Sequence, residues 1–178
     1  MSDAVAPMGN MTFAGIATVR EIGPLGMIAL RATADARGLA AAVHAVTGTA
    51  LPRQRAILRQ GECWTAWMSP DEYLLVLPRA DVPAALTKLT ETMGGAHHLA
   101  VDVSDARSVF RIEGAGADVV ISRLCPVDLA RLAEGEIRRT RAAQVACALW
   151  RSDGGITLVA FRSVARYVFD ILANATRV

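Results

Sequence analysis

The sequence predicts an α+β fold made of two similar β-α-β-β-α units related by pseudo-two-fold symmetry. Short apolar runs of strand length alternate with segments whose apolar residues recur at helical spacing. The order strand, helix, hairpin, helix occurs twice along the chain. The segment AWMSPDEYLLVLPRADVPAAL of the first half also aligns by eye with ALWRSDGGITLVAFRSVARYV of the second. A repeated order of this kind is typical of a duplicated α+β architecture.

The first unit is predicted to contain four strands and two helices. Asp35 is expected to cap a helix that ends at Gly48, and Asp81 a helix that ends at Gly94 and Gly95. A turn at Ser69-Pro70-Asp71 separates two of the strands. The expected strands cover residues 27–32, 56–68, 73–77 and 97–103, and the second helix covers residues 82–93.

The second unit repeats this order. Gly114 and Gly116 are expected to turn a strand into a helix, and Ser163 to cap the closing helix. Asp153-Gly154-Gly155 has the composition of a tight hairpin turn. The expected strands are residues 108–112, 140–150 and 156–161, and the expected helices are residues 118–124 and 164–175.

These elements predict one globular domain over residues 20–178, made of two repeats at about 27–104 and 107–176. A chain of 178 residues can bury about 70 % of its unfolded surface, which suffices for a core. Residues 1–19 contain Pro7, Gly9, Asn10 and Gly15 without periodic apolar residues. We therefore expect a flexible N-terminal arm there.

The charge balance argues against nucleic-acid binding. The 19 basic and 17 acidic residues give a net charge of +2, and the one basic run is Arg138, Arg139 and Arg141. Displacing counterions from a nucleic acid needs a larger cluster of cations. No apolar run approaches the roughly 18 residues of a membrane span, and Asp3 stands where a signal peptide carries positive charge. We expect a cytoplasmic protein that binds neither nucleic acid nor membrane.

The side chains that carry chemistry are scattered. Cys63, Cys125 and Cys147 are odd in number and far apart, so they predict small buried residues in a reducing compartment. His97 and His98 are neighbours on an expected strand, point to opposite faces and cannot easily share a metal ion. Gly114 and Gly116 lack the third glycine of a dinucleotide-binding loop. His44 lies among apolar neighbours of a helix and is expected to be a packed or rim residue and not a base.

The densest group of polar residues at structured positions follows residue 100. Asp102 and Ser104 are expected to share one strand face, while Asp105 and Arg107 can pair locally. These residues can hold a ligand or connect the two halves, and the structural role is favoured. We assign no catalytic, cofactor-binding or metal-binding residue from the sequence.

Four motifs in order carry a family resemblance, and they cover the chain from about Met27 to the C-terminus. HHLAVDVSDAR at residues 97–107 is similar to the central signature of the gamma subunits of heterotetrameric sarcosine oxidase. The remaining motifs are WMSPDE at 67–72, CPVDL at 125–129, and RRTR at 138–141 with FRSVARYV at 161–168.

The resemblance implies a fold similar to the folate-binding domain of the glycine cleavage T-protein, an aminomethyltransferase. It also implies alpha, beta and delta partner subunits, with this chain packed mainly against alpha. The assembled enzyme demethylates sarcosine to glycine, passes the one-carbon unit to tetrahydrofolate and forms hydrogen peroxide. FAD, FMN and NAD belong to the alpha and beta chains, so no cofactor is expected in this chain, which is expected to be non-catalytic.

Two departures limit what is carried over. The catalytic aspartate of the T-protein corresponds only loosely to Asp102, which we expect to be structural. The lysine-glycine-cysteine-tyrosine motif of related folate-dependent proteins is absent. A gamma subunit of a related enzyme for another N-methyl amino acid, such as N-methylglutamate, and a stand-alone folate-binding protein stay open as alternatives.

A subunit made for assembly should expose apolar side chains when it is isolated. The N-terminal arm and Trp64, Trp67, Trp150 and Tyr167 are the candidates for that surface, although burial of each tryptophan in the core is at least as well supported.

Overall fold

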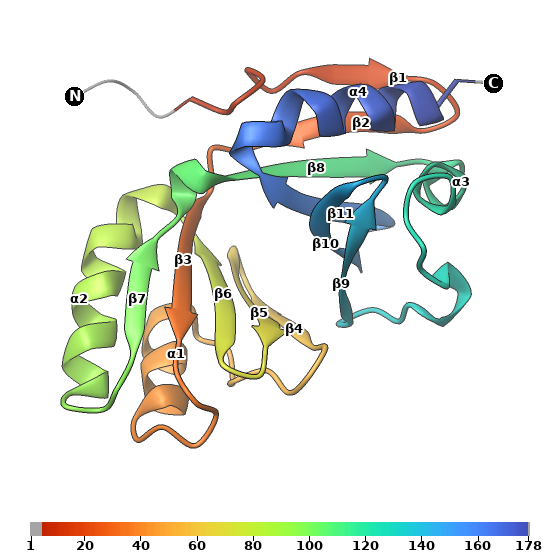
Figure 1. Cartoon of the computed structure of the whole chain (residues 1–178). Coiled ribbons are helices and arrows are strands. Elements are labelled where there is room, and N and C mark those ends of the chain that lie inside the picture. The colour runs from red at the N-terminus through yellow and green to blue at the C-terminus, as the bar shows by residue number, and fades with distance from the viewer. Residues whose placement is uncertain (1–4, 178) are drawn as a thin grey trace. The chain divides into compact units, whose positions relative to one another are not determined.

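The computed structural model describes residues 5–177, which form two compact units (Figure 1). The central unit is Leu25–Ser104. The composite unit joins the described residues before Leu25 to those from Asp105 onward. The break after Ser104 lies where the sequence places the boundary between the two repeats. Their union in one globular domain stays a prediction.

The central unit contains a five-stranded antiparallel sheet with two helices on one face. Helices α1 (Leu39–Thr47) and α2 (Val82–Met93) pack against each other and the sheet. In spatial order the strands are β4 (Ile57–Gln60), β5 (Cys63–Ser69), β6 (Glu72–Leu77), β3 (Gly26–Arg31) and β7 (Leu99–Asp102).

The core of the central unit follows from the spacing of apolar residues. Val82, Ala85, Leu89 and Met93 recur every three or four positions along α2, so they form one buried stripe. That stripe joins alternate residues of β3 and β6 in a single apolar cluster.

The composite unit contains a six-stranded antiparallel sheet, also with two helices packed on one face. Helices α3 (Ala117–Ser122) and α4 (Ala165–Ala175) bury Val120, Val168 and Leu172 against the sheet, and Phe169 lies 6.4 Å from Phe110 between ring centroids. In spatial order the strands are β1 (Thr12–Ala14), β2 (Thr18–Ile22), β8 (Arg107–Glu113), β11 (Gly155–Phe161), β10 (Val145–Ser152) and β9 (Ile137–Ala142).

The two units repeat one order of elements. The run β3, α1, β4, β5, β6, α2 corresponds to β8, α3, β9, β10, β11, α4, and the sheet orders β4-β5-β6-β3 and β9-β10-β11-β8 agree. The α+β class and the duplicated pattern are thus confirmed. The strands that precede the two runs are exchanged: β2 precedes β3 but pairs with β8, whereas β7 precedes β8 but pairs with β3.

Each of the two repeats has one more strand than the sequence predicts. Residues 56–68 form β4 and β5 around a turn at Gly61, and residues 140–150 are divided between β9 and β10 by a turn at Ala143. Ala143 has a φ of 50°, a left-handed conformation that few alanines adopt. Because nothing in the local sequence marks that turn, the two arms look like one strand.

The predicted helix caps are corrected in the same way. Helix α1 begins at Leu39, after Gly38 in a left-handed conformation, and not next to Asp35. Asp81 does precede α2, but its side chain makes no capping hydrogen bond. Ser163 lies in a one-turn 3₁₀ helix before α4 and likewise does not cap it. A one-turn 3₁₀ helix leads into both α2 and α4. It changes the direction of the Asp81 and Ser163 side chains, which do not cap the helices.

The sequence predicts a flexible arm over residues 1–19. The structure instead has strands within it, β1 at residues 12–14 and the start of β2 at residues 18–19. Strand β2 pairs with β8 from Thr18 to Ile22, and Val19 is fully buried. Glu21 is also buried, and its Oε2 accepts hydrogen bonds from the backbone N–H groups of Met8 (2.9 Å) and Asn10 (3.0 Å). Residues 1–4 of the predicted arm lie outside the described residues.

This ordering gives a test in Val19→Ala. Removing two buried carbon atoms should lower the free energy of unfolding by roughly 2 kcal/mol, because apolar contacts are lost and a cavity is left. Val5→Ala is the matched control, since Val5 is 59 % exposed and should change little. Urea unfolding curves of the two variants measure the difference. Equal stabilities would mean that β2 does not contribute to the folded core.

Candidate functional site

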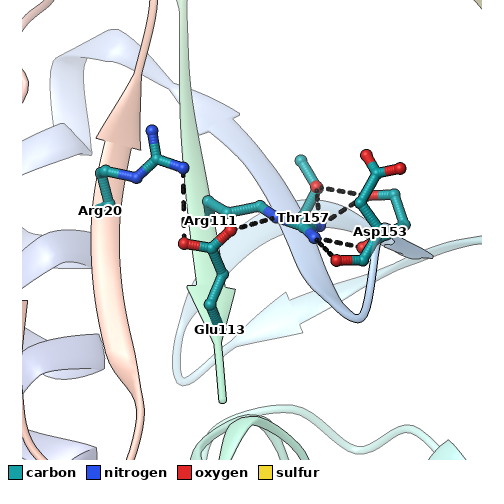
Figure 2. Close-up of polar contacts among 6 residues, drawn as sticks. Arg20, Arg111, Glu113, Asp153 and Thr157 are labelled. Carbon is teal, nitrogen blue, oxygen red and sulfur yellow. Dashed lines mark hydrogen bonds and ion pairs between the residues drawn. The ribbon is translucent and has the colours of Figure 1, made fainter.

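A buried arginine organises a polar cluster in the composite unit (Figure 2). Arg111 on β8 donates from Nη1 to Ser152 Oγ (2.6 Å) and Thr157 Oγ1 (3.0 Å). Nη2 donates to the backbone carbonyls of Ser152 and Asp153, the latter at 2.9 Å. Nε donates to Glu113 Oε1 at 3.3 Å. The guanidinium therefore has an acceptor for every one of its five N–H groups.

Local sequence explains how the cluster forms. Arg111 and Thr157 are directly opposite in the pairing of β8 with β11, so their side chains share one face. Asp153 and Gly154 both have positive φ, which turns the carbonyls before β11 toward the guanidinium. At Gly155, a Cβ atom would lie 2.5 Å from the Ile112 carbonyl oxygen and 3.1 Å from Arg111 Nη2. The glycine is needed for this close approach.

The chemistry that this cluster allows is limited. The Ser152 and Thr157 hydroxyls lie 2.9 Å apart and both accept from Arg111, so their lone pairs are used within the protein. The Glu113 carboxylate pairs with two arginines, Arg111 at 3.3 Å and Arg20 at 3.4 Å. A guanidinium whose donors all bind the protein has none left for an anionic ligand. The cluster holds the β10–β11 turn against β8.

A second arginine fixes the chain between α3 and β9. Arg151 pairs with Asp118 through Nη1 (2.9 Å) and Nη2 (2.8 Å), and it donates to the carbonyls of Leu129 and Leu132. The hydrogen bonds from Arg151 hold the pKa of the Asp118 carboxyl below its usual range. The sequence analysis missed both arginines. The signal was a charged residue inside an otherwise apolar strand, as in SVFRIE and ACALWRS.

The polar residues predicted around position 102 are brought together in part. Asp102 Oδ1 accepts from the backbone N–H of Ser104 (2.9 Å) and from its Oγ (2.5 Å), and Ser104 Oγ accepts from the Met27 N–H. These contacts fix the end of β7 against β3. Asp105 lies 3.8 Å from Arg162, and Arg107 stacks over the Phe161 ring at 4.3 Å. Asp105 and Arg107 thus each contact the end of β11 or the turn after it.

The structure also places the histidines and the glycine turn that the sequence analysis considered. His44 and His97 are exposed, and His98 Nδ1 lies 2.8 Å from the Ala96 carbonyl. Within residues 5–177, no three His, Cys, Asp or Glu side chains gather as metal ligands. A Cβ at Gly116 would lie 2.4 Å from the Ile16 carbonyl oxygen, so the N-terminal segment fills the space beside this turn. The turn does not fit a dinucleotide phosphate.

The aromatic candidates for an interface differ in exposure. Trp150 is buried, Trp64 and Trp67 are half-buried, and Tyr167 is 45 % exposed. In the described part of the chain, no helix has the length and apolarity needed to cross a membrane.

The family model and the related sequences point to the same family. The model of the sarcosine oxidase, gamma subunit family matches residues 31–177. Sarcosine oxidase subunit gamma of an Arthrobacter species is 33 % identical over 149 residues, which are 82 % of this chain and 72 % of the relative.

Solved structures agree with this result. A chain of heterotetrameric sarcosine oxidase from Corynebacterium sp. U-96, in complex with pyrrole 2-carboxylate, superposes with a TM-score of 0.86 and 26 % identity. The match covers 97 % of this chain and 94 % of that one. Glycine cleavage system aminomethyltransferase T from Bartonella henselae shares the fold, with a TM-score of 0.62 at 15 % identity over 85 % of this chain and 44 % of that protein.

The Arg111 cluster is tested by Arg111→Lys. A lysine keeps the charge but cannot supply five N–H donors in a planar fork, so buried acceptors lose their partners. The free energy of unfolding should fall by roughly 2–3 kcal/mol. Arg166→Lys is the control, because the Arg166–Asp170 pair is exposed on α4 and should change little. Thermal and urea unfolding measure both, and an equal loss in the two variants would contradict the role of Arg111.

Proposed function

The chain belongs to the sarcosine oxidase gamma subunit family, and from this premise we propose that it is a non-catalytic subunit of a heterotetrameric enzyme that oxidises sarcosine. Its own role is assembly: it packs mainly against the alpha subunit in the cytoplasm. The observation that carries the proposal is the structural likeness to a chain of heterotetrameric sarcosine oxidase over nearly the whole length of both. The beta and delta subunits complete the complex.

The internal polar contacts support a non-catalytic role. The donors of the Arg111 guanidinium are all taken by the protein, and the Asp102 carboxylate binds Ser104. A catalytic group needs a face turned toward a substrate and a partner that activates it. In the clusters described above, the functional groups are instead used to hold turns and strand ends.

We expect the cofactors of the complex to lie outside this chain. The glycine turn at Gly114–Gly116 does not fit a dinucleotide, since Ile16 fills the space beside it. As the family resemblance implies, we propose that FAD, FMN and NAD are held by the alpha and beta subunits, and that the complex passes the one-carbon unit of sarcosine to tetrahydrofolate outside this chain. The products are then glycine and hydrogen peroxide.

Strand β7 is the proposed surface for the partner subunit. Leu99 is 55 % exposed and Val101 41 %, while Ala100 between them packs on the helix side of the sheet. The two side chains therefore share the face away from α1 and α2. In the described sheet β7 pairs only with β3, which leaves its other edge open. An apolar edge strand of this kind is suited to pairing with another chain.

The test is a native purification of the tagged chain from its own cells, followed by intact-complex mass and the visible absorption spectrum. A complex that carries flavin absorption and contains three further chains supports the proposal, and its substrate profile separates sarcosine from N-methylglutamate. A chain recovered alone and without flavin overturns it. Fluorescence titration with tetrahydrofolate then tests the stand-alone folate-binding alternative.

Asp102→Ala tests whether the chain is catalytic. Loss of the contacts with Ser104 should lower the stability of the subunit by about 1 kcal/mol, because one side-chain anchor of the β7 end is removed. Turnover per flavin in the purified, fully assembled variant should be unchanged. A large loss of turnover in a complex of normal mass and flavin content would mean that Asp102 takes part in the reaction.

The β7 surface is tested by the double variant Leu99→Ser, Val101→Ser. If both side chains are buried by the partner, the loss of apolar burial should weaken assembly at least about tenfold. Val119→Ser on α3 is the matched control, since Val119 is 44 % exposed outside the proposed surface. Co-expression with the other subunits and quantitative pull-down compare the variants. Assembly of the double variant at the control's level would exclude β7 as the interface.

A further inference from the structure

We propose that the outer edge of β9 binds an extended acidic segment of another polypeptide, which joins the composite sheet as a further strand. Strand β9 is the last strand of that sheet and, in the part of the chain that the structure describes, it pairs only with β10. It carries the basic run of the sequence, which is too short to bind a nucleic acid. The structure shows why a strand-shaped protein segment fits there instead.

The hairpin register decides which backbone groups of β9 point outward. A two-residue turn at 143–144 joins β9 to β10, so Ala142 and Val145 are the pair next to the turn. In such a hairpin this pair exchanges both of its hydrogen bonds, and the pairs that follow alternate between hydrogen-bonded and non-hydrogen-bonded. Arg141 and Arg139 belong to the non-hydrogen-bonded pairs. Their backbone N–H and C=O groups therefore point away from β10, toward the open edge.

The side chains of the same two residues bring positive charge to this edge. Arg139 and Arg141 are two positions apart, so they lie on one face of β9, and both are exposed. Opposite them on β10 are Ala148 and Ala146, which carry no charge. Arg139 also interacts within the protein, whereas Arg141 forms no side-chain hydrogen bond or ion pair among residues 5–177. Arg141 is therefore the main side-chain contact expected for the partner.

The third arginine of the run has a different place. Arg138 points to the opposite face of β9 from its neighbour Arg139. Its Nη1 lies 2.7 Å from Glu136 Oε1, and both side chains of this pair are mostly buried. The charge of Arg138 is thus offset inside the protein. Strand β9 itself contains no acidic residue, so the exposed charge of its edge is positive.

This charge selects the occupant of the edge. If two copies of β9 paired antiparallel about their centres, Arg139 would face either itself or Arg141, and like charges directly opposite are destabilising. An extended segment with Asp or Glu at alternate positions would instead place carboxylates opposite both arginines. A carboxylate also matches the paired N–H donors of a guanidinium. The occupant that fits is an acidic strand from a different chain.

The edge of β9 differs in chemistry from the β7 surface proposed above. The exposed side chains of β7 are apolar, while those at the β9 edge are cationic. The two edges therefore suit different segments. Binding at β9 depends on the backbone and charge of this edge alone, and not on which enzyme the chain belongs to.

The experiment measures peptide binding to the full-length chain by fluorescence anisotropy at low salt. The probe is a fluorescein-labelled peptide of Glu-Val repeats. Two matched peptides have Lys in place of Glu, or carry N-methyl groups on the Glu nitrogens, which face β9 when the carboxylates lie opposite the arginines. Only the unmodified Glu peptide should bind, because the Lys peptide is repelled and the methylated one cannot pair as a strand. Hydrogen exchange in residues 137–142 should slow when it binds.

A charge reversal locates the binding site. Arg141→Glu should weaken binding of the Glu peptide roughly fivefold or more, because a like charge replaces an opposite one across the strands. Arg37→Glu is the matched control, since Arg37 is exposed in the central unit and the net charge changes equally. Absence of binding by the Glu peptide, equal affinity for the Lys or the methylated peptide, or equal affinities of the two variants would each overturn the proposal.

Discussion

The fold depends on the exchange of two strands between the sheets. Strand β2 comes before the central unit in the chain but pairs with β8 over its whole length, while β7 comes before β8 and pairs with β3. Each sheet is thus completed by a strand from the segment that leads into the other unit. The backbone N–H and C=O groups of β8 and β3 find partners on both sides only because of this exchange. The repeats are similar in sequence order, yet only the first contains its whole sheet; the second needs β1 and β2 from the start of the chain.

The sequence could predict the elements whose signals are local. The second helix was expected at residues 82–93 and α2 has these bounds, since its apolar stripe and the glycine after it mark both the face and the end. The Asp153–Gly154 turn is also found as expected. Strand β2 could not be predicted, because Val19 is buried by residues far away in the chain. The turn at Ala143 depends on a positive φ that no residue type announces.

The candidate site was less predictable for the same reason. Arg111 has its partners on β8 and on the β10–β11 hairpin, 41 to 46 residues later in the chain, so local pattern shows only an unexplained charge in a strand. Asp102 and Ser104 were expected on one strand face, but β7 ends at Asp102 and Ser104 lies in the 3₁₀ turn that follows, where the two side chains are hydrogen-bonded. The polar residues described here mostly anchor turns and strand ends. This distribution is one of the observations that support the proposed role in assembly.

The exchange of strands also sets an order for synthesis on the ribosome. Arg20 and its ion-pair partner Glu113 are 93 residues apart, and β2 leaves the ribosome long before β8 exists to receive it. The central unit has all its strands once Asp102 has emerged, so it can fold first. Although β2 can pair with β1 during that period, it must wait for β8, and contacts of such long range slow the final step. Strand β2 therefore completes the composite sheet only after the whole central unit has been synthesised.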